Sequence, residues 1–212
     1  MTLEVTDFRK DVRNVLITPE IRSRFMRLGP GESGSAHTHD LGHEVFLILD
    51  GQAEFIIDGD RAVLSPGQLC VALAGQMHEV HTVGDKPMTM YLSVTPHIEP
   101  THTFWDDHGN QLPPRYGGST RAEREAAGPP TAPTQAVLDA HLAMLASLSD
   151  QLAQARQSQS ALARRLKAAQ ETGDNTASKA ALDAIWAELL PTFRLVGKLA
   201  ENWNDLATRI AG

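Results

Sequence analysis

The sequence has a single cysteine, Cys70, and no hydrophobic run as long as a lipid bilayer requires. One cysteine excludes an intrachain disulfide. Because Cys70 lies in the apolar run QLCVALAG, we expect a small buried side chain there and no nucleophile or metal ligand. The opening residues, MTLEVTDFRKDVRN, lack the apolar stretch of a signal peptide. We therefore expect a cytoplasmic protein that does not enter a membrane.

Positive charge is also scarce. The chain of 212 residues has 19 Lys and Arg against 26 Asp and Glu, a net charge of −7. Residues 1–130 hold 11 basic and 18 acidic residues, and residues 131–212 hold 8 of each. An acidic first part and a second part without a basic stripe argue against a nucleic-acid partner. No phosphate loop, dinucleotide fingerprint or catalytic-triad pattern is present.

The composition changes near residue 130. Before it, short β-like runs are separated by turn signals such as DG, DGD, SPG and GDKP, a spacing typical of an all-β sandwich or barrel. Residues 110–134 are rich in Pro and Gly and are expected to link two regions, 1–109 and 135–212. The predicted strands are Ile21–Leu28, Ala36–His39, Glu44–Leu49, Gln52–Ile57, Arg61–Leu64, Gln68–Ala72, Glu79–Val83 and Met88–Val94.

The second region has helical spacing. Leu138, Leu145, Leu152 and Leu166 fall on one seven-residue series, and Leu148, Ala155, Leu162 and Ala169 fall on another, which together predict an a/d seam. After ETGDNT, apolar residues recur every three or four positions up to Ile210, and Pro191 is expected to kink this second helix. We predict an antiparallel helical hairpin that packs on the β-domain or on a second copy, giving a homodimer. Trp186 and Trp203 are expected in its core; a ligand-binding helical box is the alternative.

The segment HTHDLGHE, residues 37–44, concentrates possible metal ligands. On a strand, His37 and His39 point to one face, and a turn at DLG would bring Glu44 to the same site. His78 follows a separate turn and could converge with them. Three imidazoles and a carboxylate suit a divalent transition metal, Fe, Mn, Co, Ni, Zn or Cu, and do not suit calcium. Glu44 could instead orient a ligand imidazole, with His43 ligating in its place.

These stretches resemble the two signatures of the cupin family. GESGSAHTHDLGHEVFLILDG, from Gly31 to Gly51, has every fixed position of the first. GQLCVALAGQMHEVHT is similar to the second but has Leu73 where the family usually has Pro and Thr82 where it usually has Asn. The resemblance covers about residues 20–105. It implies a double-stranded β-helix, or jelly roll, with a metal held by His37, His39, Glu44 and His78 and with open water positions on that metal.

The remaining histidines are expected outside the site. His81 has the opposite strand parity to His78, which predicts a surface or interface position. His97, His102 and His108 lie in TPHIEPTHTFWDDHGN, which we expect to be a polar loop; alternatively it covers one end of the barrel, where His102 would reach a substrate. His141 is expected to be structural.

Strand parity also predicts a pocket that is apolar and has few polar groups, which favours a hydrophobic or aromatic molecule. Its expected lining is Phe25, Phe46, Phe55, Met77, Val80, Thr82, Met90 and Leu92. The cupin resemblance makes an Fe(II) or Mn(II) dioxygenase of a small molecule the first hypothesis, with metal-dependent isomerase, lyase or hydrolase chemistry also open. A non-catalytic sensing module with a helical oligomerisation tail is the alternative, and a purely structural metal site is a third.

Overall fold

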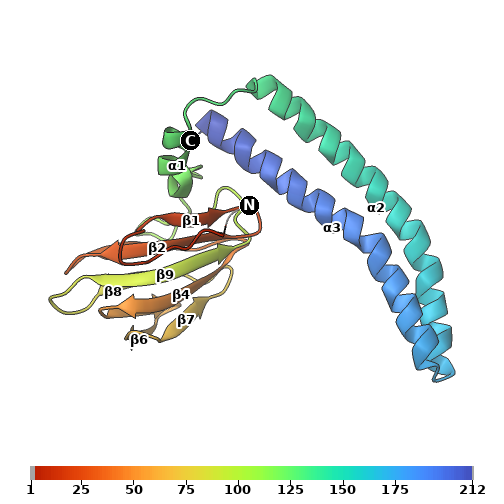
Figure 1. Ribbon diagram of the computed structural model, residues 1–212, viewed down its shortest axis with the longest axis horizontal. Coiled ribbons are helices and arrows are strands. Elements are labelled where there is room, and N and C mark those ends of the chain that lie inside the picture. Colours follow the sequence, from red (N-terminus) through yellow and green to blue (C-terminus); the bar gives the residue numbers. More distant parts are fainter. Residues whose placement is uncertain (1–2, 212) are drawn as a thin grey trace. The chain divides into compact units, whose positions relative to one another are not determined.

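The computed structural model describes residues 3–211, which form two compact units (Figure 1). The first unit extends to Pro130 and includes the end of the chain from Ala207, and the second spans Thr131–Leu206. The boundary falls inside residues 110–134, the segment that we expected to be a linker, and the same segment contains a 3-10 turn, η1 (Gly118–Thr120), and helix α1 (Arg121–Ala127). No helix in the described range is long and apolar enough to cross a membrane.

The first unit contains two antiparallel sheets. One has five strands in the order β1-β2-β9-β4-β7, and the other has four in the order β3-β8-β5-β6. The strands are β1 (Asn14–Ile17), β2 (Arg22–Leu28), β3 (Ser33–His37), β4 (His43–Asp50), β5 (Ala53–Ile57), β6 (Asp60–Leu64), β7 (Leu69–Ala72), β8 (His78–Thr82) and β9 (Met88–Thr95). This arrangement confirms the predicted β-barrel fold followed by helices.

The core lies between the inner faces of the two sheets. Along β4, Glu44, Phe46 and Ile48 are buried and alternate with residues that are exposed or half-buried, as the period of two requires. Phe46 packs on Phe55 of the opposite sheet, with ring centroids 4.9 Å apart. Fully buried Met88 and other apolar side chains complete this cluster. Burial of apolar surface from both sheets is therefore what stabilises the unit.

The strand ends differ from the predicted ones by a few residues, and one strand was missed. Strand β1 pairs along the edge of β2, with an irregular register between Asn14 and Leu16. Its short sequence, NVLI, has no alternation that would reveal it. Strand β3 begins at Ser33 because its small polar residues pair with β8, a long-range contact that outweighs their low strand propensity.

The second unit contains most of the predicted helical hairpin. Helix α2 (Thr134–Glu171) and helix α3 (Asn175–Ala211) are joined by a three-residue turn, and they run side by side in Figure 1. In the turn, Gly173 has a φ of 69°, and the Asp174 carboxylate accepts a hydrogen bond of 2.9 Å from the backbone N–H of Ala177. Pro191 lies inside α3 and does not end it.

Only one of the two predicted leucine series lies against the facing helix. Ala155 and Ala169 are buried and Leu148 and Leu162 are half-buried. Leu138, Leu145 and Leu152 are exposed and Leu166 is half-buried, so most of the first series is not covered within the hairpin, which fits the expectation that the hairpin packs on something further. A hairpin of two helices can bury one stripe of each helix and leaves the next stripe uncovered.

Candidate metal centre

Four side chains with metal-binding donor atoms meet between the two sheets. His37 ends β3, and His78 opens β8, where the two residues are paired across the antiparallel ladder. His39 follows β3 after a single bridge residue, and Glu44 enters from β4 in the opposite sheet. Residues from both sheets and from two distant parts of the sequence therefore build one site.

A tight turn between His39 and Glu44 makes this convergence possible. A Cβ atom on Gly42 would lie 2.8 Å from Cγ1 of Val94 and 3.1 Å from the carbonyl oxygen of Pro96. Those contacts leave no space for a side chain. The turn predicted at DLG is therefore present, and it places Glu44 on the inner face with the histidines.

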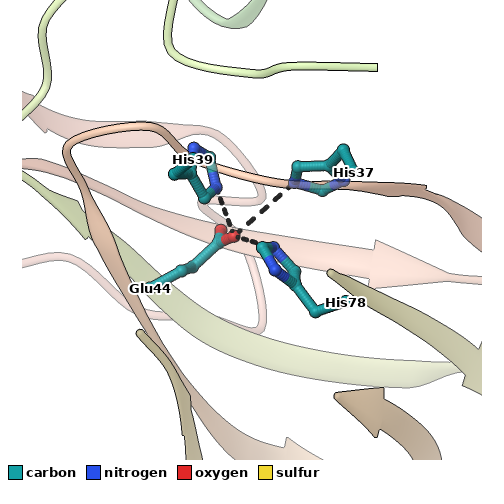
Figure 2. Close-up of side chains that lie close together, drawn as sticks. All are labelled: His37, His39, Glu44 and His78. Carbon is teal, nitrogen blue, oxygen red and sulfur yellow. Dashed lines mark hydrogen bonds and ion pairs between the residues drawn. The ribbon is translucent and has the colours of Figure 1, made fainter. Parts of the chain in front are cut away.

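The donor atoms converge on one carboxylate oxygen. All four lie within 4.8 Å of one another. The Nε2 atoms of His39, His78 and His37 lie 2.8, 3.0 and 3.8 Å from Oε2 of Glu44 (Figure 2). His39, Glu44 and His78 are buried and His37 is half-buried, so the site is largely shielded from water.

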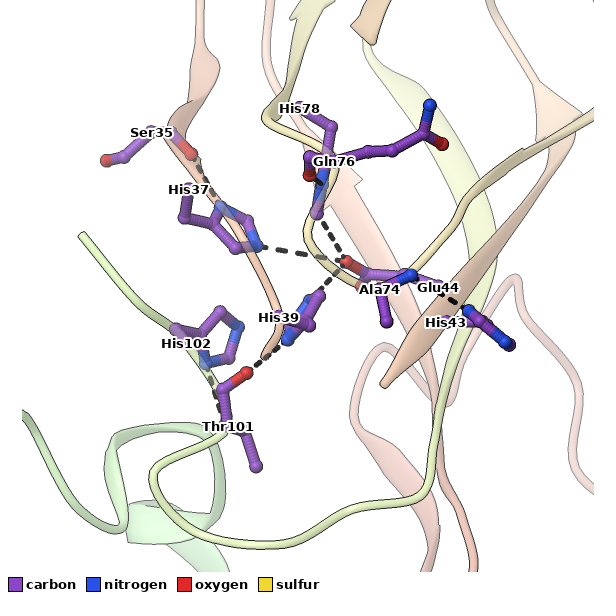
Figure 3. Close-up of polar contacts among 10 residues, drawn as sticks. All are labelled: Ser35, His37, His39, His43, Glu44, Ala74, Gln76, His78, Thr101 and His102. Carbon is purple, nitrogen blue, oxygen red and sulfur yellow. Dashed lines mark hydrogen bonds and ion pairs between the residues drawn. The ribbon is translucent and has the colours of Figure 1, made fainter. Parts of the chain in front are cut away.

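Backbone carbonyl groups fix the orientation of the three imidazoles (Figure 3). The Nδ1 atom of each ring faces a carbonyl oxygen: that of Ser35 at 2.8 Å from His37, that of Gln76 at 2.9 Å from His78, and that of Thr101 beside His39. A carbonyl oxygen only accepts hydrogen bonds, so each Nδ1 carries the proton. In the neutral ring, Nε2 then holds a lone pair that points at the centre of the cluster.

This arrangement fits a cation. The buried Nε2 atom of His37 has no hydrogen-bond partner among the described residues. Three lone pairs and one carboxylate repel one another unless a metal ion or a proton lies between them. Carbonyl groups that hold Nδ1–H are also the usual supports of histidines that bind metals. The four residues could therefore hold a metal ion, and three nitrogens with one oxygen suit a divalent transition metal.

The electrostatics of the cluster agree with its geometry. Burial alone would raise the pKa of Glu44, but the neighbouring imidazoles of His37, His39 and His78, which favour the charged carboxylate, hold that pKa well below its ordinary value. Burial alone would lower the pKa of His78, and the Glu44 carboxylate outweighs it and raises that pKa. Glu44 is therefore charged at neutral pH, and protons and a metal ion would compete for the same imidazoles.

His102 lies next to the cluster, although we expected it in a polar loop. Its ring centroid is 4.7 Å from that of His37 and 4.8 Å from that of His39. Thr103 and Thr38 form an isolated bridge with backbone hydrogen bonds of 2.8 and 3.0 Å, which holds this segment against the barrel. Burial, together with the charges of His37 and His39, lowers the pKa of His102 well below its usual range. The alternative, in which this segment covers one end of the barrel, describes the structure better.

The other histidines take different roles. His43 is exposed and accepts a hydrogen bond of 2.9 Å from the backbone N–H of Ala74, so it points away from the cluster (Figure 3). His81 is half-buried and lies 3.3 Å from the carboxylate of Glu79. Burial raises the pKa of Cys70 to about 11, which keeps the thiol protonated and unreactive.

A cavity of about 640 Å³ opens onto the cluster. Its lining includes His37, Glu44 and His78 together with His102. Four of the eight residues predicted to line a pocket also line this cavity: Phe46, Val80, Met90 and Leu92. The site is therefore joined to a space large enough for a small organic molecule.

The other four predicted residues do not line the cavity. Phe25 lies on the opposite face of β2, where its ring contacts Tyr91 edge to face at 6.1 Å, and its neighbour Met26 takes the inner position. Phe55 packs against Phe46 in the core, Met77 immediately precedes β8, and Thr82 is the last residue of β8. The parity prediction failed for Phe25 because the register of β2 is set by its pairing with β9.

The predicted scarcity of polar groups in the pocket is also wrong. Arg22, Arg24, Arg115 and Arg121 all line the cavity. In the sequence, the only indication that Arg22 and Arg24 face the cavity is that they alternate with Met26 on one face of the strand RSRFM. The same alternation also fits a strand face that is exposed to solvent.

Comparison with known proteins finds a match to part of the first unit. A family model described as a cupin domain matches residues 24–95. An oxalate-binding protein from Thermotoga maritima is 30% identical over 60 residues, which are 28% of this chain and 50% of that protein. The chain therefore spans about half the length of the curated relative that it matches.

Solved structures are also similar to part of this chain. A protein with a double-stranded β-helix domain from Klebsiella pneumoniae is 23% identical with a TM-score of 0.42, covering 45% of this chain and 91% of that one. The protein TT1209 from Thermus thermophilus is 22% identical with a TM-score of 0.43, covering 44% and 98%.

Proposed function

The chain belongs to the cupin superfamily through residues 24–95, and from this premise we propose that it is a metal-dependent dioxygenase of a small organic molecule. The observation that carries the proposal is the cluster of His37, His39, Glu44 and His78 at the wall of a cavity of about 640 Å³. Four donors that face a cavity leave room for a substrate beside the metal, whereas a structural site is closed. The name of the Thermotoga relative, an oxalate-binding protein, is in keeping with a small-molecule ligand.

The roles of the protein groups follow from their positions. His37, His39, Glu44 and His78 would hold Fe(II) or Mn(II), and the bound metal would supply the activation of oxygen. The carbonyl groups of residues 35, 76 and 101 keep the imidazoles oriented. His102 stays neutral beside them and can accept or donate a hydrogen bond to a molecule in the cavity. The lone cysteine is in keeping with a reducing, cytoplasmic location.

The test begins with metal analysis of the purified protein, followed by anaerobic loading with Fe(II). Oxygen consumption is then measured with catechols, flavonols and β-diketones. We expect substrate-dependent oxygen uptake by the loaded wild type and at least a 100-fold lower rate for Glu44→Gln, which keeps the shape of the side chain and removes its charge. Binding of the metal with no oxygen uptake for any of these classes would contradict the oxygenase proposal.

A sensing module with an oligomerisation tail is the second candidate, and the hairpin supplies its support. Trp186 and Phe193 on α3 are 55% and 56% exposed, and their rings lie 6.0 Å apart. On α2, Leu138, Leu145 and Leu152 form an exposed series at the seven-residue spacing of a coiled-coil seam. A homodimer would cover both faces in a four-helix arrangement.

Sedimentation analysis tests this candidate. We expect a dimer for the wild type and a monomer after Leu145→Glu with Leu152→Glu, while Lys167→Glu, a change at an exposed position of the same helix, keeps the dimer. A ligand-dependent shift of the dimer equilibrium without turnover would favour a sensor over an enzyme. A wild type that is monomeric at all concentrations would contradict the dimer.

A further inference from the structure

Strand β2 presents two arginines to the cavity. Arg22, Arg24 and Met26 alternate along the strand on its inner face and all line the cavity. The sheet register aligns each arginine with residues of the two neighbouring strands. Arg22 on β2 pairs with Val94 on β9, and Val94 pairs with Glu44 on β4. In the same way, Arg24 is aligned through Leu92 with Phe46. Arg22 is thus two strands from the metal-binding carboxylate, a backbone separation of roughly 10 Å.

Neither of these two guanidinium groups forms an ion pair with a described residue, and the carboxylates of Glu44, Glu99 and Glu123 attract them only from a longer distance. Arg22 is only 2% exposed, Arg24 is half-buried, and the buried Nε atom of each has no hydrogen-bond partner. Among residues 3–211, no carboxylate lies within the 4.0 Å of an ion pair with either of them. An arginine remains charged when buried, so a guanidinium without a directly bonded acceptor can gain from an anion that binds to it.

The rest of the cavity wall is also basic. Arg115 and Arg121, both exposed, line its outer part, and the guanidinium carbon of Arg115 lies 5.0 Å from the ring centroid of Phe104. The acidic side chains that line the cavity are Glu44 and Glu79, and the Glu44 carboxylate already contacts the imidazoles of His39 and His78. A chain with a net charge of −7 therefore places four arginines around one cavity. Such a field attracts anions.

We propose that this cavity binds an organic carboxylate, with its anionic group on Arg22 and Arg24 and its apolar body against Met26, Met90 and Leu92. The planar guanidinium donors match the two oxygens of a carboxylate. The three apolar side chains come from neighbouring strands and continue the same inner face. The proposal rests on the proposed function in one respect: the far end of the molecule would face the metal-binding cluster.

Calorimetric titration of the metal-free protein with hydrocinnamate, a carboxylate with an apolar body, and with its uncharged amide tests the proposal. We expect hydrocinnamate to bind at least 10-fold more tightly than the amide. Arg24→Gln, and independently Arg22→Gln, should weaken hydrocinnamate binding about 10- to 100-fold and leave amide binding unchanged. Arg27→Gln is the matched control, since Arg27 lies on β2 but is exposed, donates to Oγ1 of Thr89 and does not line the cavity.

The remaining measurements separate this proposal from a structural role of the arginines and from the metal proposal. Removing an unpaired buried charge should not lower the thermal unfolding midpoint of either variant, whereas loss of a structural contact would. Metal content should stay at the wild-type level in both. Arginine-dependent binding in a protein that takes up no metal would support this proposal and refute the oxygenase. Equal binding of acid and amide, variants that behave like Arg27→Gln, or no saturable binding at millimolar hydrocinnamate would overturn it.

Discussion

Replacing His78 with alanine removes one of the four donors and leaves a small space in a buried site. The Nε2 atom of His78 lies 3.0 Å from Oε2 of Glu44, and its Nδ1 is held by the carbonyl oxygen of Gln76. Four-donor zinc sites bind with about 10–16 kcal/mol. One quarter of that is about 2.5–4 kcal/mol, so we expect the dissociation constant of the metal to rise about 60- to 700-fold.

The same change can be measured as a thermal shift. At a free metal concentration about 100 times the wild-type dissociation constant, binding stabilises the folded wild type by about 2.7 kcal/mol. For a chain of this size that corresponds to an increase in the unfolding midpoint of about 5–10 °C. A 100-fold weaker variant at the same concentration gains only about 0.4 kcal/mol, or about 1 °C. The two proteins should therefore differ clearly in the shift that Mn(II) or Ni(II) produces.

His81→Ala is the control, because His81 lies on the same strand and has its nearest acidic partner, Glu79, outside the cluster. It should retain the wild-type shift and metal content. Unfolding of the metal-free variants in urea shows whether either change damages the fold itself. A His78→Ala protein that folds normally and keeps wild-type metal affinity would refute the ligand set.

Three further predictions concern the fold around the site. Burial, with the charges of Arg22 and His39, lowers the pKa of His97 to about 4. Since the unfolded chain takes up that proton near pH 6.5, the free energy of unfolding should fall by about 3 kcal/mol as the pH falls from 7 to 4. Urea unfolding of His97→Asn should show a correspondingly flatter pH dependence. Gly51→Ala should destabilise the protein by about 3 kcal/mol or more, because Gly51 has a φ of 71° and a Cβ there would lie 2.5 Å from the carbonyl oxygen of Pro87; an unchanged unfolding midpoint would contradict this. Ile48→Ala should cost about 2–5 kcal/mol, because Ile48 is fully buried and leaves a cavity, while Val63→Ala at an exposed position should change stability by less than about 1 kcal/mol.

Local sequence was sufficient for the strands and for the donors of the site. Alternation along β4 predicted that Glu44, Phe46 and Ile48 share a face, and the structure confirms it. The spacing of His37 and His39, a glycine in the turn and a separate His78 predicted four donors that could meet, and they do lie together. These features depend on strand period and turn chemistry, which act over a few residues.

Predictions that required knowledge of strand pairing were less successful. The inner face of β2 carries Arg22, Arg24 and Met26, not Phe25, because β2 takes its register from β9. Hydrophobicity alone favoured the phenylalanine. His102 was expected in a polar loop and instead lies half-buried beside the cluster, because a backbone bridge to Thr38 holds its segment against the barrel.

The sequence by itself determined the β-domain followed by two helices, the alternation within most strands, and the identity of the residues that could hold a metal ion. Each of these follows from interactions between residues that are close in the chain. Only the tertiary structure decided which charges face the cavity, because a strand offers two faces and long-range pairing selects one of them. That selection placed arginines at the cavity of an acidic protein, and for this reason the ligand that we propose is an organic anion with an apolar body, where the sequence favoured a hydrophobic or aromatic molecule.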